Sequence, residues 1–140
     1  MTAINGHTKG DCIMKLSTFL SIAAVVAFLF GAAFLLAPAP TVSIYGVTLD
    51  TAGKFIARYL GSAFIGVAVL TWCARFANPQ GQGVRAILSG NFFLCSTGLV
   101  AALFDKFYGV GNDMVWSTVV IYFLLAIGFG YFRFVKSTSS

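Results

Sequence analysis

The stretch LSIAAVVAFLFGAAFLLA, residues 20–37, decides the class of fold, because its only polar side chain is that of Ser21. An α-helix needs about 20 predominantly apolar residues to cross the hydrocarbon core of a bilayer. A strand of a membrane β-barrel would alternate apolar and polar residues, and this run does not alternate. The stretch therefore predicts a transmembrane helix that is closed by Pro38 and Pro40.

Three further segments are also long and apolar, so the chain is expected to be all-α, with four transmembrane helices in one bundle. The third of the four is the most polar, since it holds Ser89, Asn91, Ser96 and Thr97. The predicted helices cover residues 16–37, 55–77, 84–104 and 114–135. The transmembrane domain is expected over residues 14–136, with a disordered tail over residues 1–13 and a short tail over residues 137–140.

The composition suits lipid rather than water, because 59% of the residues are hydrophobic and only 9% are charged. A soluble domain usually carries about 25% charged residues. The net charge of +5 is spread over connections, tails and helix ends, which is how membrane proteins distribute charge. We therefore expect the lipid bilayer as a partner and no binding to nucleic acid.

The basic residues also predict the orientation of the bundle. In a four-span topology the two termini and the middle connection share one side of the membrane. That side carries Lys9, Lys15, Arg75, Arg85, Arg133 and Lys136, whereas the other carries Lys54, Arg58 and Lys106 together with Asp50, Asp105 and Asp113. Both termini are therefore expected in the cytoplasm, with the protein in a bacterial inner membrane.

A cleaved signal peptide is the alternative interpretation of the first helix, because Lys15 precedes the apolar run and Met14 is an alternative start. The run is longer than the 7–15 residues that are usual for the core of a signal peptide. A cleavage site at residues 37–39 would also leave Pro40 just after the cut. We therefore expect an uncleaved helix.

A short stretch occurs twice, as YGVTLD at residues 45–50 and as YGVGND at residues 108–113. A tyrosine suits the membrane interface, and a glycine gives the backbone the freedom for a tight turn. A carboxylate before a helix accepts backbone N–H bonds, so Asp50 and Asp113 are predicted to cap the following helices. Two alternatives stay open: the acidic loops bind a cation or a basic substrate group, or the two helical hairpins arose by duplication.

Arg58 and Asn91 are the polar side chains within the helices that most need a partner. Arg58 is expected near the end of its helix, where it snorkels or pairs with Asp50 or Asp113. Asn91 is expected to hydrogen-bond to another helix, with Ser62, Thr71 and Thr118 as candidate partners. Small residues at four-residue spacing, such as Gly31 in the first helix and Gly61 in the second, predict close helix packing. The candidate binding residues are Arg58, Asn91, Asp50 and Asp113.

The sequence carries no pattern of catalytic or cofactor chemistry. It has no P-loop, no HExxH and no GxSxG, and its only histidine is His7. All four acidic residues lie in connections or in the N-terminal tail, whereas proton-coupled transport usually needs an acid within the membrane. We therefore expect no enzyme, no cofactor and no metal site.

The stretches PTVSIYG, residues 40–46, and ARYLGSAFIG, residues 57–66, resemble a pattern in uncharacterised small four-helix bacterial integral membrane proteins. In that pattern a proline-containing loop ends in Tyr-Gly, and the next helix opens with Arg-x-x-Gly and further glycines. The residues that match are Pro40, Tyr45, Gly46, Arg58, Gly61 and Gly66. The resemblance covers about the first half of the chain, and it implies an integral membrane protein with no catalytic residues to carry over.

Two functions follow as expectations. The preferred one is a non-enzymatic accessory subunit or a homo-oligomeric structural protein, which binds a membrane-protein partner or a second copy of itself. The alternative is a small transporter, or a module that binds a lipid or small molecule at an inter-helix site near Arg58 and Asn91. A cavity that reaches Arg58 would favour the alternative, and a tightly packed bundle would favour the subunit.

Overall fold

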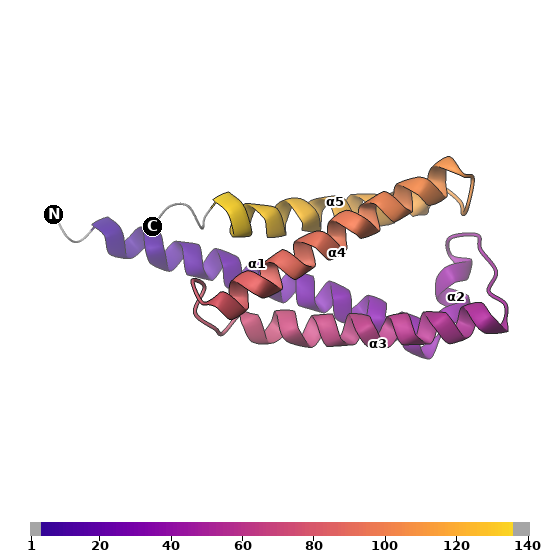
Figure 1. The fold of residues 1–140 in the computed structure, drawn as a ribbon, viewed down its shortest axis with the longest axis horizontal. Coiled ribbons are helices and arrows are strands. Elements are labelled where there is room, and N and C mark those ends of the chain that lie inside the picture. The colour runs from indigo at the N-terminus through magenta and orange to yellow at the C-terminus, as the bar shows by residue number, and fades with distance from the viewer. Residues whose placement is uncertain (1–3, 136–140) are drawn as a thin grey trace.

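The fold is helical throughout the part of the chain that the computed structural model describes, which is the backbone of residues 4–135 and the side chains of residues 15–135. No strand occurs in this backbone, which confirms the predicted all-α class. The elements are α1 (Ile4–Leu36), α2 (Pro38–Ser43), α3 (Thr51–Ala74), α4 (Gln82–Phe107), α5 (Val115–Gly130) and the π-helix η1 (Tyr131–Val135), and Figure 1 shows their arrangement.

Four segments within residues 4–135 are long and apolar enough to cross a membrane, as the sequence predicts. They are Lys15–Leu36, Thr51–Ala74, Gln82–Phe107 and Val115–Val135. Each exposes large apolar side chains on its outer face, for example Leu29, Leu70, Phe93 and Leu124. Such surfaces are stable against lipid tails and unfavourable in water.

Several helix ends differ from the predicted ones. α1 begins at Ile4, so it extends over most of the segment that the sequence predicts to be a disordered tail. Once a helix has nucleated, each added residue gains a hydrogen bond at little cost, and no proline interrupts the chain before Pro38. α3 begins at Thr51, before the predicted residue 55, because Asp50 caps it. The predicted tail over residues 137–140 lies outside the described residues.

The bundle consists of two helical hairpins. α1 packs mainly against α3, and α4 packs mainly against α5, whereas the direct packing of α3 on α4 is less extensive. Figure 1 shows that the hairpins approach each other where α3 leads into α4 and diverge toward the opposite end. We call the first the basic end, for the arginines described below, and the second the loop end, because it holds the connections 44–50 and 108–114.

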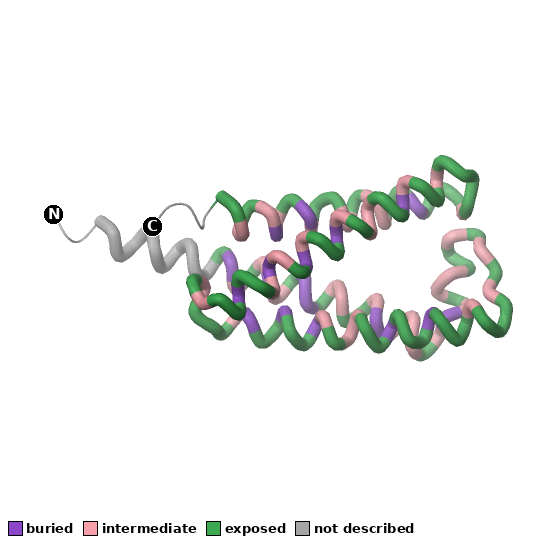
Figure 2. Tube along the Cα trace, viewed as in Figure 1, coloured by how far each residue is buried: buried purple, intermediate pink, exposed green. Residues whose placement is uncertain are grey.

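The apolar core lies toward the basic end. Its buried members come from all four spans, and they are Leu16, Leu20, Ala23, Ala74, Val84, Leu88, Cys95, Ala126 and Phe129. Figure 2 shows buried positions along the facing sides of the helices and exposed positions along their outer sides. The two hairpins are therefore joined chiefly by this cluster.

The closest approach of α1 and α3 occurs at two glycines. A Cβ atom added to Gly31 would lie 2.9 Å from the carbonyl oxygen of Gly61, and one added to Gly61 would lie 2.7 Å from that of Gly31. Both residues belong to the predicted small-residue faces, and both are buried. The structure thus confirms that small residues allow close packing of these two helices.

Candidate functional site

The four candidate binding residues do not come together. Asp50, Arg58 and Asp113 are exposed, whereas Asn91 is buried within the bundle. No hydrogen bond or ion pair joins any two of them in the part of the chain whose side chains are described. Each therefore has to be explained by its own surroundings.

Asp50 and Asp113 play different roles, although they hold the same place in the repeated stretch. The Asp50 Oδ1 accepts a hydrogen bond of 2.7 Å from the backbone N–H of Gly53, so Asp50 caps α3 as predicted. The Asp113 Oδ1 lies 2.7 Å from the Nζ of Lys106, which donates a hydrogen bond to it in a salt bridge. This hydrogen bond and the positive charge of Lys106 hold the pKa of Asp113 below its ordinary value of 3.8.

The predicted capping of α5 by Asp113 is wrong. The N-cap of α5 is Met114, and no side chain caps the helix there. One residue before Asp113, the Oδ1 of Asn112 accepts a hydrogen bond of 3.0 Å from the backbone N–H of Met114. The carboxylate is engaged by Lys106 because a bond between two charged groups is stronger than one to a neutral amide.

Arg58 lies about two turns inside α3, and its side chain is exposed. Neither Asp50 nor Asp113 pairs with it, and within the described side chains its guanidinium forms no hydrogen bond or ion pair. The expected ion pair is absent because one carboxylate caps a helix and the other binds Lys106. Arg58 is thus placed to extend along the outer surface of the helix, as a snorkelling side chain does.

Asn91 connects α4 to α3 in the interior of the bundle, one turn before the end of α3. Its Nδ2 donates hydrogen bonds to the Thr71 Oγ1 at 3.2 Å and to the Ile87 carbonyl oxygen at 3.0 Å. Thr71 is 1% exposed, so the pair is shielded from the surroundings. The predicted bond to another helix is confirmed, with Thr71 as the partner among the three candidates.

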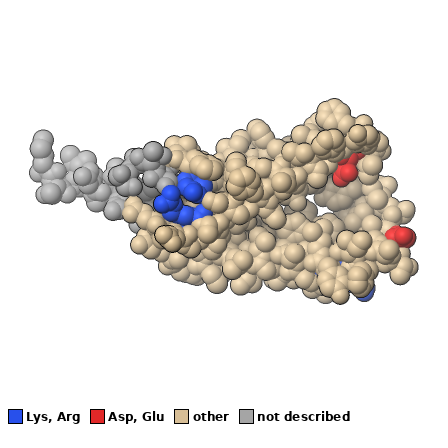
Figure 3. Space-filling view, viewed as in Figure 1, with Lys and Arg blue, Asp and Glu red and all other residues tan. Residues whose placement is uncertain are grey.

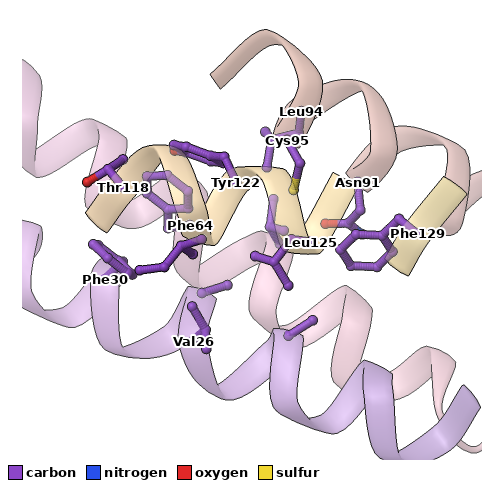
Figure 4. Close-up of a pocket in the computed structure, with 14 residues that line it drawn as sticks. Val26, Phe30, Phe64, Asn91, Leu94, Cys95, Thr118, Tyr122, Leu125 and Phe129 are labelled. Carbon is purple, nitrogen blue, oxygen red and sulfur yellow. The ribbon is translucent and has the colours of Figure 1, made fainter. Parts of the chain in front are cut away.

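A small cavity lies between the two hairpins beside Asn91, and Figure 4 shows its lining. Its volume is about 50 Å³, whereas pockets for small molecules measure about 300–1,000 Å³. Figure 4 shows the side-chain oxygen of Asn91 directed toward the cavity, and no described residue donates a hydrogen bond to this oxygen. Most other lining residues are apolar, and Arg58 is not among them.

The two copies of the repeated stretch meet at the loop end. The backbone N–H of Asn112 donates a hydrogen bond of 2.7 Å to the Tyr45 carbonyl oxygen, and its Nδ2 donates one of 2.9 Å to the Ile44 carbonyl oxygen. The Thr118 hydroxyl adds a hydrogen bond of 3.1 Å to the Tyr45 hydroxyl. Gly46 and Gly109 adopt φ values of +74° and +73°, so both turns need glycine, as predicted.

A groove runs between α1 and α3 on the outside of the first hairpin. It has a volume of about 300 Å³. It is lined by Ala24, Val25, Phe28, Ala68, Val69 and Trp72, which are all apolar. The two alanines are buried, while the valines and aromatic residues around them are exposed.

The basic end gathers arginines that lack an acidic partner. Arg75 donates a hydrogen bond of 3.1 Å to the Ser21 hydroxyl, and Arg133 donates one of 2.7 Å to the Ser89 hydroxyl. Figure 3 shows a cluster of Lys and Arg atoms toward this end, whereas the visible Asp or Glu atoms lie toward the loop end together with a few further Lys or Arg atoms. In the described part of the chain the one ion pair is that of Lys106 with Asp113, at the loop end.

Asn112, Arg75 and Arg133 are not among the candidate binding residues predicted from the sequence, and the signals for them are unequal. Asn112 replaces the Leu49 of the first copy, so a polar residue at an otherwise similar turn is a usable signal. The partners Ser21 and Ser89 stand out as polar residues of apolar segments, but nothing in the sequence pairs them with Arg75 and Arg133. Among the described side chains, no three of His, Cys, Asp and Glu are grouped so that they could hold a metal ion.

Comparisons with protein-family models, with curated proteins and with solved structures found no match to this chain. The likeness of PTVSIYG and ARYLGSAFIG to small four-helix bacterial membrane proteins therefore stays a prediction.

Proposed function

We propose that the chain is a non-enzymatic, multi-pass protein of a bacterial inner membrane, where it associates with other transmembrane helices as an accessory subunit or a homo-oligomer. Of the seven basic residues whose side chains are described, four belong to the basic end and three lie toward the loop end with the acidic residues. The four are Lys15, Arg75, Arg85 and Arg133, and the three are Lys54, Arg58 and Lys106. Since positive residues favour the cytoplasmic side, this distribution supports cytoplasmic termini.

The groove between α1 and α3 is the observation that carries the proposal. Small side chains, Ala24 and Ala68, form its floor, and bulky ones border it. Helices associate in membranes by van der Waals packing, with large side chains of one helix against small ones of the other. A groove of this shape fits a ridge of aliphatic side chains on a neighbouring transmembrane helix.

The cavity beside Asn91 supports a second candidate, the binding of a small molecule between the hairpins. The unpartnered oxygen of Asn91 would supply a polar contact there. The volume of about 50 Å³ matches one or two water molecules rather than a metabolite. The cavity also does not include Arg58, so the geometry favours the structural role.

A bulky substitution on the border of the groove tests the proposal. Val69 is 55% exposed beside the groove, and Val100, 51% exposed on α4, is not among its lining residues. The protein is extracted gently from its native membrane and analysed by native electrophoresis and mass spectrometry. The wild type should appear either as a homo-oligomer or in a complex with a stoichiometric protein partner. Val69→Trp should reduce this association, and Val100→Trp should preserve it. Association that is absent in the wild type, or equally reduced in both variants, would contradict the proposal.

A reporter fused to the C-terminus tests the orientation separately. An enzyme that is active only in the cytoplasm should be active in this fusion, and one that is active only in the periplasm should be inactive. The reverse pattern would contradict the proposed topology without affecting the groove.

A further inference from the structure

The arginines of the basic end have no acidic partner among the described side chains, and serine hydroxyls orient two of them, Arg75 and Arg133, without neutralising their charge. Arg133 bonds to Ser89 through its Nε, so its Nη groups form no bond to a described residue. Arg85 is exposed, and its side chain has no hydrogen-bond or ion-pair partner in the described part of the chain. A hydroxyl fixes the direction of a guanidinium but does not neutralise it, so an anion would be favoured here.

Arg133, which belongs to η1, bonds to the face of α4 that carries Arg85. Ser89, the partner of Arg133, follows Arg85 by four residues, and its hydroxyl donates a hydrogen bond of 2.9 Å to the Arg85 carbonyl oxygen. Residues four apart are neighbours on the surface of a helix. The guanidinium of Arg133 is therefore held beside the turn of α4 that carries Arg85.

The start of α4 adds a second attraction for an anion at the same place. The N-cap of this 26-residue helix is Gly81, and no side chain caps it. Its first N–H groups are therefore open, and the helix dipole favours negative charge there. A Cβ atom added to Gly83 would meet nothing within 4 Å, so the first turn is also sterically accessible.

Arg75 brings a third cation to this end. Its guanidinium carbon lies 4.1 Å from the centre of the Trp72 ring and 4.4 Å from that of Phe76, and its buried Nε has no hydrogen-bond partner. Ala74, the neighbour of Arg75, and Val84, the neighbour of Arg85, belong to the same core cluster. The packing that joins the hairpins thus also brings these arginines to one end of the bundle.

We propose that this basic end binds a phosphate group, at the start of α4 between Arg85 and Arg133. Arginine binds phosphate through parallel N–H donors, and basic pockets between transmembrane helices suit anionic lipid headgroups. Aromatic side chains such as Trp72 mark the level of the membrane interface, where headgroup phosphates lie. Free inorganic phosphate offers the same chemistry and is the other source to be distinguished.

The experiment uses the purified full chain with equal amounts of phosphatidylglycerol and phosphatidylcholine of identical acyl chains. Native mass spectrometry then measures how many molecules of each lipid stay bound. We expect the wild type to prefer phosphatidylglycerol, and each of Arg85→Gln and Arg133→Gln to reduce this preference about fivefold. Lys54→Gln and Arg58→Gln remove the same charge at the other end of the bundle and should leave the preference unchanged.

Two further measurements keep the proposal testable. Arg133→Lys retains the positive charge, and with it the signal for membrane insertion, but loses the planar guanidinium donors. It should therefore weaken the preference for phosphatidylglycerol less than Arg133→Gln does. Radiolabelled inorganic phosphate, added to the protein in phosphatidylcholine nanodiscs, tests the soluble source. Phosphate binding that Arg85→Gln abolishes, without a lipid preference, would assign the site to free phosphate. Absence of both, or an equal loss in the Lys54 and Arg58 variants, would overturn the proposal.

Discussion

The side-chain amide of Asn112 donates a hydrogen bond to the carbonyl oxygen of Ile44, 68 residues earlier in the chain, and so joins the two connections at the loop end. Asn112 stands where the first copy of the repeated stretch has Leu49. The shared residues Gly46 and Gly109 form the turns, whereas the contact between the hairpins is formed by a residue that the copies do not share. The shared glycines therefore serve the turns, whereas the residue that differs between the copies joins the two connections at the loop end.

Asn112→Asp should weaken the junction of the two connections. The new carboxylate can still accept the bond from Met114, but it cannot donate to the Ile44 carbonyl oxygen. The loss of one hydrogen bond costs about 1 kcal/mol. The backbone N–H of residue 112, which donates to the Tyr45 carbonyl oxygen, should therefore exchange with deuterium about fivefold faster. Hydrogen-exchange mass spectrometry of the protein in nanodiscs measures this rate.

Asn78→Asp is the matched control, because only the side-chain oxygen of Asn78 is used there, as the acceptor for Gln80. Exchange in the connection between α3 and α4 should stay as in the wild type. Equal exchange at Asn112 in the wild type and in Asn112→Asp would show that the side-chain bond does not hold the connections together.

Gly61→Ala should destabilise the protein, because the added Cβ would lie 2.6 Å from the backbone nitrogen of Leu35. Overpacking of this kind costs about 1–3 kcal/mol of unfolding free energy. Gly66→Ala on the same helix meets nothing within 4 Å and should be neutral or slightly stabilising. Unfolding titrations with SDS compare the two variants, and equal stabilities would rule out the close approach of α1 and α3.

The Asn91 side chain should couple energetically to Thr71. A double-mutant cycle with Asn91→Leu and Thr71→Val is expected to give a coupling energy of about 0.6 kcal/mol and at most about 1.7 kcal/mol, as for other bonds between membrane helices. The same cycle with Thr118→Val serves as control, because Thr118 lines the same cavity but bonds to Tyr45 instead. If Asn91 couples as strongly to Thr118 as to Thr71, the coupling does not come from the 3.2 Å hydrogen bond between Asn91 and Thr71.

Acid should release Asp113 from Lys106. The folded-state pKa of Asp113 lies below 3.8, so its contribution to stability is complete above pH 3.8 and is lost as the pH falls through the folded-state pKa. Because the carboxylate is exposed, the effect should be small and should weaken with added salt. NMR of the backbone amides at residues 108–113 should show this transition in the wild type and in Asp105→Asn but not in Asp113→Asn.

The sequence by itself determined the membrane class, the number of long apolar helices and the two glycine turns. These are local properties, since an apolar run of about 20 residues has few other stable states and a positive φ requires glycine at nearly any site. The capping of α3 by Asp50 was equally local, because donor and acceptor are three residues apart. Even so, the same reasoning was wrong for Asp113, because Lys106 seven residues earlier engages that carboxylate.

Only the tertiary structure decided which polar groups meet. A helix that is apolar on every side does not show which of its faces packs inward. The sequence therefore left three candidate partners open for Asn91 and gave none for Arg133 or Asn112. Their bonds to Thr71, Ser89 and Ile44 depend on the rotation and register of whole helices, which the packing of the core sets. The bonds that orient Arg75 and Arg133, and the groove between α1 and α3, arise from that same packing.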